Sequence, residues 1–190
     1  PWIVAPPTLA GMIEKAELWE ALGVHAMNEF PQWFGPSDLS LHRELVRNIP
    51  RWWKPIESMP RTLIHNDFNP RNVALRPTAE GPQLCVYDWE LATLHLPQRD
   101  VAEFLSFVLS PDATEAEVDH YVGVHRRALE EAAGVTISEE DSRFAYRRGL
   151  QDFAITRLAM YMMAHTFRHY GFMERLAETA RRLVRIEMGL

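Results

Sequence analysis

The chain has 190 residues, of which 47% are hydrophobic, and a net charge of −6 at pH 7. This length can bury one substantial core, and no apolar run approaches the ~18 residues that span a membrane. The net negative charge argues mildly against nucleic-acid binding. Residues 1–7 lack the charged start and apolar stretch of a signal peptide, and a single cysteine, Cys85, excludes an intrachain disulfide. We therefore expect a cytoplasmic protein without membrane or nucleic-acid partners, in which Cys85 is a small buried residue.

The first third of the chain is expected to be helical. One helix is predicted over residues 8–28, with Thr8 as its N-cap, and a second over 37–48. A short continuation carries Trp52 and Trp53. These rings could stack on a substrate, but tryptophans more often fill the core of a domain of this size, and we favour that interpretation.

Three β-type runs follow, at residues 62–64, 72–75 and 83–87. Residues 76–82 read as a turn between the second and third runs, because they contain two prolines and a glycine. We expect the three runs to form one small antiparallel element.

A short motif occupies the loop after the first run. His65, Asp67 and Asn72 form the pattern H-x-D-x-x-x-x-N, and Asp88 ends the third run. Protein kinases carry a catalytic loop of the form H-R-D-x-x-x-x-N, followed by a metal-binding aspartate. Phosphoryl transfer needs a carboxylate near the acceptor hydroxyl and oxygen ligands that hold magnesium on the phosphates. Asp67 can supply the first, and Asn72 with Asp88 the second.

The details of the motif resemble one branch of that superfamily. Asn66 stands where protein kinases have arginine, and Trp89-Glu90 follow the acid where they have Phe-Gly. The segment is therefore similar to the aminoglycoside phosphotransferase and choline kinase families, which typically show H-G-D-x-x-x-x-N and then I-D-W-E. The resemblance covers roughly residues 61–105.

The resemblance implies a small-molecule O-phosphotransferase that uses ATP or GTP with Mg²⁺. By that analogy Asp67 is the base or orienting carboxylate for the acceptor hydroxyl. Asn72 and Asp88 would bind magnesium and, through it, the nucleotide. His65 would be a structural residue of the loop, and Asp100, near the start of the next helix, would brace the loop from below.

Two residues depart from the family pattern. Asn66 replaces the usual glycine, and asparagine tolerates positive φ well enough to take this turn. Arg71 replaces the small residue that commonly precedes the metal asparagine. It is a candidate phosphate contact, because its guanidinium matches phosphate oxygens, although a solvated or acid-paired arginine is the more ordinary explanation.

The rest of the chain is predicted to be helical, after a loop over residues 91–96. Helices are expected over residues 97–110, 114–133, 138–170 and 172–188.

The fold class predicted is mainly α (α+β), a protein-kinase-like C-terminal lobe in which residues 1–190 form one domain around a small antiparallel β element. The nucleotide lobe of a kinase needs a Gly-rich turn and a strand lysine. No Gly-rich loop precedes His65, and the two lysines, Lys15 and Lys54, lie in helical segments. We expect the N-terminal nucleotide lobe to be missing from this chain and to act as its partner.

The acceptor is expected to be a small molecule with a hydroxyl group. It could be cationic, because four acids on the long predicted helix could line its pocket: Glu139, Glu140, Asp141 and Asp152. Acids at a helix N-terminus are also favourable in themselves. Two alternatives remain for the whole chain. One is a non-catalytic binding module with this fold. The other is a metal-dependent phosphohydrolase that uses His65, Asp67 and Asp88 as ligands.

Overall fold

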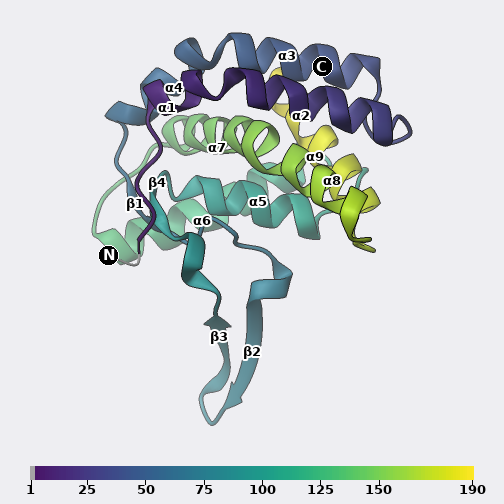
Figure 1. Ribbon diagram of the computed structural model, residues 1–190. Helices are drawn as coiled ribbons and strands as arrows, with labels where there is room; N and C mark the ends of the chain where they lie inside the picture. Colours follow the sequence, from purple (N-terminus) through teal and green to yellow (C-terminus); the bar gives the residue numbers. More distant parts are fainter. Residues whose placement is uncertain (1–2) are drawn as a thin grey trace.

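A computed structural model describes residues 3–190 of the chain. These residues form a mainly helical body from which one β-hairpin projects (Figure 1). The α-helices are α1 (Leu9–Glu14), α2 (Ala16–Glu29), α3 (Pro36–Arg47), α4 (Ile49–Ser58), α5 (Gln98–Val108), α6 (Glu115–Ala133), α7 (Glu139–Phe153), α8 (Ala159–Phe167) and α9 (Met173–Met188). The strands are β1 (Thr62–Ile64), β2 (Val73–Thr78), β3 (Gly81–Val86) and β4 (Thr93–His95). The predicted mainly α (α+β) fold class is confirmed.

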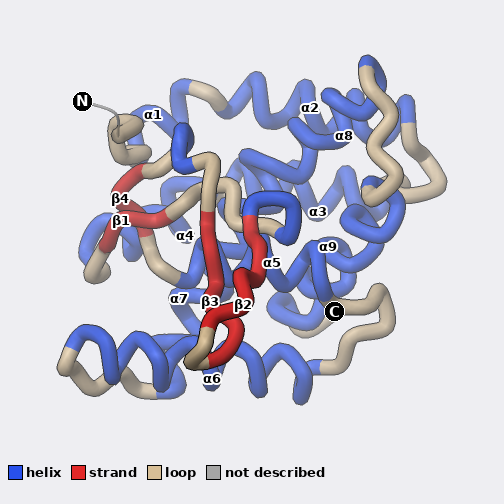
Figure 2. The backbone as a smooth tube through the Cα atoms, turned by 90° about the horizontal axis from the view of Figure 1, so that it is seen from below, coloured by secondary structure: helices blue, strands red, loops and turns tan. Residues whose placement is uncertain are grey.

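The helices pack in layers. Figure 1 shows α1 to α4 on one side of α7 and α5 on the other, with the hairpin of β2 and β3 pointing away from the body. Seen from below in Figure 2, the hairpin faces the viewer and α6 runs along one edge of the molecule. None of the helices in residues 3–190 combines the length and the apolar character that crossing a bilayer requires.

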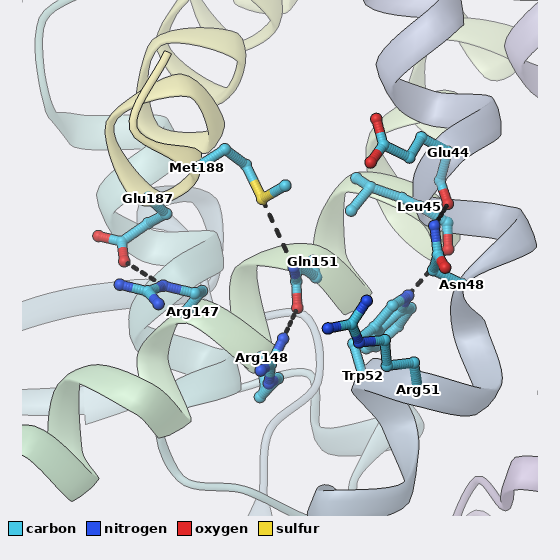
Figure 3. A pocket seen from close by; sticks show the side chains of 10 residues that line it. All are labelled: Glu44, Leu45, Asn48, Arg51, Trp52, Arg147, Arg148, Gln151, Glu187 and Met188. Atoms are coloured by element: carbon cyan, nitrogen blue, oxygen red, sulfur yellow. Dashed lines mark hydrogen bonds and ion pairs between the residues drawn. The ribbon is translucent and has the colours of Figure 1, made fainter.

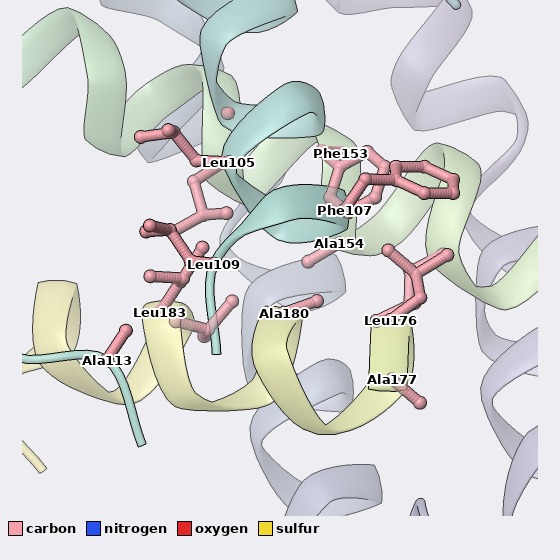
Figure 4. Close-up of a cluster of buried hydrophobic side chains, with 14 of the residues drawn as sticks. Leu105, Phe107, Leu109, Ala113, Phe153, Ala154, Leu176, Ala177, Ala180 and Leu183 are labelled. Carbon is pink, nitrogen blue, oxygen red and sulfur yellow. The ribbon is translucent and has the colours of Figure 1, made fainter. Parts of the chain in front are cut away.

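The core lies where these helices meet. Figure 4 shows one part of it, in which side chains from α5, from the end of α7 and from α9 interlock, among them Leu105, Phe153 and Leu176. A second cluster, under α1 to α4, contains Trp52 and Trp53, which are 3% and 1% exposed. The prediction that these tryptophans fill the core is therefore confirmed.

The strands form two separate sheets rather than the single element that was predicted. β1 pairs with β4 in antiparallel fashion, with Thr62 opposite His95. β2 pairs with β3, with Val73 opposite Val86. Residues 91–96, predicted as loop, contain the missing partner of β1. This strand was missed because three residues are too short for a periodic signal, and its register is set by β1, about 30 positions earlier.

Two predicted helices are interrupted. Thr8 caps α1 as predicted, its hydroxyl accepting a hydrogen bond from the backbone N–H of Gly11, but the helix over 8–28 divides at Lys15. The helix divides there because its two parts pack on different helices: α1 packs on α4, whereas α2 packs on α3. The helix over 138–170 changes to a π-helical segment at Ala154–Leu158, before α8 continues it to Phe167.

The projecting hairpin also corrects the expectation for Cys85. This residue lies in β3 and is half-buried rather than buried, because β2 and β3 leave the body and pack mainly on each other.

Candidate functional site

The loop between β1 and β2 is anchored from below by Asp100, in the first turn of α5. Its Oδ2 accepts a hydrogen bond from the backbone N–H of His65 at 2.7 Å, and its Oδ1 accepts one from the N–H of Asn66 at 2.9 Å. Burial raises the pKa of Asp100 above its usual range, although the two backbone donors oppose that effect. One carboxylate thus fixes two successive peptide units of the loop.

His65 is buried, and both nitrogens of its ring are engaged. Nδ1 accepts a hydrogen bond from the backbone N–H of Asp67 at 3.3 Å, so Nε2 carries the proton and donates to the carbonyl of Tyr87 at 2.8 Å. The ring also packs against Phe68 and Trp89. His65 therefore ties the loop to the end of β3, and neither nitrogen is available to a metal.

Two residues of the motif have a left-handed backbone. Asn66 has φ 61° and Asp88 has φ 67°, and no other non-glycine residue in the part of the chain that the structure describes has positive φ. The prediction that Asn66 takes the tight turn is confirmed. Left-handed conformations at non-glycine residues carry a cost, and they cluster at functional sites.

Asp67 and Asn72 are joined directly. The Nδ2 of Asn72 donates to Oδ2 of Asp67 at 2.8 Å and to its backbone carbonyl at 2.9 Å. Asn69 donates to Oδ1 of the same carboxylate at 3.2 Å. Because the Asn72 amide group points its nitrogen at Asp67, its Oδ1 remains free to bind something else. No hydrogen bond within residues 3–190 reaches that oxygen.

Asp88 is brought to the same end of the hairpin by strand register. The last ladder pair is Val73 with Val86, and the backbone N–H of Tyr87 extends it by donating to the carbonyl of Asn72 at 3.1 Å. Asp88 is the next residue, and its side chain is exposed. Its carboxylate forms no ion pair or hydrogen bond with the described residues. Asn72 thus belongs to the last hydrogen-bonded pair of the hairpin and Asp88 follows the other member, Tyr87; each has a side-chain oxygen without a hydrogen-bond partner among the described residues.

Two residues near the end of the chain complete the surroundings of Asp67. The hydroxyl of Tyr161, in α8, donates to its Oδ1 at 2.5 Å. Arg157, in the π-helical segment, lies 3.6 Å from the same oxygen and donates to the carbonyl of Asn66 at 2.5 Å. Neither residue was identified from the sequence, because nothing in the local pattern links them to a loop about 90 positions earlier. π-helical segments are frequent at functional sites, but this one has no sequence signature.

These contacts determine the charge state of Asp67. Partial burial by itself would raise the pKa of this carboxyl. Hydrogen bonds from Tyr161 and Asn72, with the positive charges of Arg157 and Arg71, outweigh burial and hold the pKa below its usual range. Asp67 is therefore a firmly ionised carboxylate at neutral pH.

Arg71 points into a group of aromatic rings. Its guanidinium carbon lies 4.6 Å from the ring centre of Phe172, 5.4 Å from Phe107 and 5.6 Å from Tyr161. Its Nε donates to the side chain of Asn69 at 3.0 Å. No carboxylate in residues 3–190 forms an ion pair with it, so the acid-paired alternative finds no support, whereas the residue is exposed to solvent, in line with the other ordinary explanation. The guanidinium is held beside Asp67 by stacking.

A buried ionic network lies behind the loop. Arg99 is fully buried and donates to Asp152 at 2.7 Å and to Glu103 at 2.9 Å. The second oxygen of Glu103 lies 2.9 Å from the Tyr161 hydroxyl, so the network reaches Asp67 through that tyrosine. Burial raises the pKa of Glu103, although the charge of Arg99 opposes it.

This network bears on the acids that were expected to attract a cationic acceptor. Asp152 is paired with Arg99, Glu139 is paired with Arg126, and Asp141 bonds to the N-cap residue of its own helix. Three of the four acids thus have structural partners away from Asp67.

Comparison with known proteins identifies the family. Residues 11–135, well over half of the chain, match the model of the phosphotransferase enzyme family. Among curated proteins, none matches the sequence significantly. The matched segment contains all six candidate residues, from His65 to Asp100, but ends before Arg157 and Tyr161.

Proposed function

Because the chain belongs to the phosphotransferase enzyme family, we propose that it transfers the γ-phosphoryl group of ATP or GTP to a hydroxyl of a small molecule. One observation carries this proposal: Asn72, which fixes the carboxylate of Asp67, and Asp88 lie at the same end of the hairpin, and each keeps a side-chain oxygen without a hydrogen-bond partner among residues 3–190. A phosphotransferase needs this pairing of an orienting carboxylate with oxygen ligands for a metal.

In this proposal Asp67 orients the acceptor hydroxyl. Tyr161 and Asn69 engage Oδ1 and Asn72 engages Oδ2, which leaves a lone-pair position on Oδ2 for the hydroxyl proton. A carboxylate with a lowered pKa is a weak base. Weak basicity suits a loose transition state, in which positioning contributes more than early removal of the proton.

Magnesium would be held by Asn72 and Asp88. Both offer hard oxygen donors, which Mg²⁺ prefers, and the remaining ligand positions would be taken by nucleotide phosphates and water. No cluster of three or more His, Cys, Asp or Glu side chains in residues 3–190 could hold a metal without such help. When bound, the ion would neutralise charge on the phosphates.

The other residues of the motif have supporting roles in this proposal. Asp100 and His65 hold the loop in shape through the contacts described above. Arg71 is a candidate contact for a phosphate oxygen, since its Nη1 donates no hydrogen bond to any of the described residues, while Nε and Nη2 donate to Asn69 and Tyr161. Residues 1–190 would form the C-terminal lobe, and further contacts to the nucleotide would come from a lobe outside these residues.

The two alternative functions, a phosphohydrolase and a non-catalytic binding module, would require different arrangements of the motif residues. A phosphohydrolase that uses His65 as a ligand is disfavoured, since both ring nitrogens are engaged. A non-catalytic binding module would not require Asp67 to be fixed from three sides. The binding module remains the second candidate, and a measurement of catalytic turnover distinguishes it from an enzyme.

The experiment compares charge-removing variants in the full-length protein. Asp67→Asn should keep the affinity for magnesium-ATP but lower kcat by roughly 100-fold or more, because only the orienting carboxylate is lost. Asp88→Asn should weaken binding of magnesium-ATP as well. Glu80→Gln, at the exposed tip of the hairpin, is the matched control and should behave as wild type.

Transfer is measured with ATP and GTP against a panel of sugar and amino-alcohol acceptors, and binding by calorimetry. Full activity of Asp67→Asn would remove that residue from the mechanism. Nucleotide binding without transfer to any acceptor would favour the binding module, and phosphate release without an acceptor would favour the hydrolase.

A further inference from the structure

A second polar hollow lies between α3, α4, α7 and the end of α9. It has a volume of about 330 Å³, which is within the range of small-molecule sites. Figure 3 shows its lining, to which Arg51, Arg147 and Arg148 all contribute. None of the lining residues belongs to the catalytic loop or to the residues that contact Asp67. The hollow is therefore distinct from the candidate active site.

The three arginines differ in how their charge is balanced. Arg147 pairs with Glu187 at 3.3 Å, and that carboxylate is also paired with Arg143 at 2.6 Å. Arg51 and Arg148 form no ion pair with any residue from 3 to 190. Two guanidinium groups thus face this space without a neutralising carboxylate. Glu44, the remaining acid of the lining, lies across the hollow from Arg148 in Figure 3 and forms no ion pair among the described residues.

Arg148 is built into the wall rather than extended into solvent. Its guanidinium stacks 4.4 Å from the ring centre of Phe144, and one nitrogen donates to the neutral amide of Gln151 at 2.7 Å. Its Nε is fully covered and has no hydrogen-bond partner. The side chain of Gln151 is itself held by Met188, as Figure 3 shows. A fixed, half-buried guanidinium that lacks an anion is costly unless an anion joins it.

We propose that this hollow binds the phosphate group of a small molecule, with Arg51 and Arg148 as its principal contacts. Arginine recognises phosphate through parallel N–H donors, and such charge-assisted bonds are stronger than neutral ones. Burial and the neighbouring charges of Arg147 and Arg51 lower the pKa of Arg148, so a bound anion would also relieve repulsion among the three. Trp52 and Leu45 give the hollow an apolar wall for the uncharged part of the ligand.

The test titrates three probes into the full-length protein at constant ionic strength: glucose 6-phosphate, inorganic phosphate and glucose. Binding is followed by calorimetry and by the NMR signals of the arginine Nε–H groups. Either phosphate-containing probe should shift the signals of Arg51 and Arg148, and glucose should not. Tighter binding of the sugar phosphate would identify an organic phosphate as the ligand. Equal binding would show that free phosphate is sufficient.

Variants assign the binding to this hollow. Arg51→Gln and Arg148→Gln should each weaken phosphate binding by about tenfold. Glu44→Gln should tighten it, because it removes the one unpaired negative charge of the lining. Arg47→Gln is the matched control: Arg47, at the end of α3, lines a different hollow with Ile13 and Glu17, and its loss should leave binding unchanged.

Arg71→Gln removes the candidate phosphate contact of the active site, so the shifts of the Arg51 and Arg148 signals should persist in this variant, which separates the two sites. The proposal is overturned if no probe shifts the Arg51 and Arg148 signals. It is equally overturned if Arg51→Gln and Arg148→Gln bind phosphate as wild type does. Should Arg148→Gln fail to fold, Arg51→Gln at an exposed position and Glu44→Gln still decide the matter.

Discussion

The hydroxyl of Tyr161 lies 2.5 Å from Oδ1 of Asp67 and so joins α8 to the loop after β1. The same hydroxyl is 2.9 Å from Oε1 of the buried Glu103. A hydroxyl has one proton, so it can donate to only one of these oxygens. This hydroxyl therefore links Asp67 to the buried Glu103, whose other oxygen is paired with Arg99.

Tyr161→Phe should raise the pKa of Asp67 toward its ordinary value and lower the rate of phosphoryl transfer. A hydrogen bond to a charged group is worth ~1.5–3 kcal/mol, which corresponds to a loss of roughly 10- to 100-fold in kcat if the bond is needed in the transition state. The pKa is measured by ¹³C NMR titration of the Asp67 carboxyl, and kcat is measured by the transfer assay. Tyr170→Phe is the control, since no hydrogen bond to the Tyr170 hydroxyl is formed in residues 3–190. An unchanged Asp67 pKa in Tyr161→Phe would refute the contact.

Asp100→Ala should destabilise the fold, because the backbone N–H groups of His65 and Asn66 would lose their acceptors in a buried place. Each such loss costs ~1–3 kcal/mol, so the two together should cost about 2–6 kcal/mol in the free energy of unfolding. Asp100→Asn keeps one acceptor oxygen and should cost less. Urea unfolding gives the energies, and faster hydrogen exchange at those two amides locates the effect. Wild-type exchange in Asp100→Ala would be inconsistent with the anchoring.

Gly149→Ala should destabilise the protein although it improves helix propensity. A Cβ at Gly149 would lie 2.9 Å from Cα and 3.0 Å from the backbone nitrogen of Arg99, so α5 and α7 would have to separate. Overpacking of this kind typically costs ~1–3 kcal/mol. Gly123→Ala, in α6, meets only the flexible end of Arg127 at 3.4 Å and should stabilise by up to ~1 kcal/mol. Thermal unfolding of both variants checks that Gly149→Ala lowers the stability and that Gly123→Ala raises it.

The contribution of Asp67 to stability should depend on pH in a definite direction. Its folded pKa lies below the ordinary value, so the ionised form is favoured by folding. The stabilisation is therefore present above the unfolded pKa of ~3.9 and is lost as pH falls through the folded pKa. The difference in unfolding free energy between wild type and Asp67→Asn should shrink on acidification below about pH 4. A difference that grows on acidification would contradict the lowered pKa.

Residues 1–190 alone should bind magnesium-ATP weakly and transfer phosphate negligibly. In a two-lobe kinase the Gly-rich loop and the strand lysine make most of the phosphate contacts, and these features were not found in the sequence. Calorimetry and transfer assays measure both properties, and a protein that includes the proposed nucleotide lobe is the comparison. Robust transfer by the isolated chain would mean that the nucleotide site is built within it.

Features that depend on neighbouring residues in the chain could be predicted from the sequence. The helical character, the cap at Thr8 and the left-handed turn at Asn66 all follow from residues close together in the chain. The pairing of β1 with β4 was not predictable, because its energy comes from contacts between segments about 30 residues apart. The same holds for the candidate site: the motif identified Asp67, Asn72 and Asp88, whereas Tyr161 and Arg157 are near Asp67 only through tertiary packing.

The π-helical segment Ala154–Leu158 has a consequence for how this part of the chain can vary. A π-helical turn holds one residue more than an α-helical turn, so α8 is rotated by about 100° relative to a continuous helix from α7. Arg157 and Tyr161, which are four residues apart, both face the loop from this segment and from α8. Because the π-helical turn accommodates one extra residue, deletion of one residue within 154–158 other than Arg157 would restore a regular helix and leave Tyr161 facing Asp67. The surroundings of Asp67 can thus tolerate a change in the number of residues in this turn.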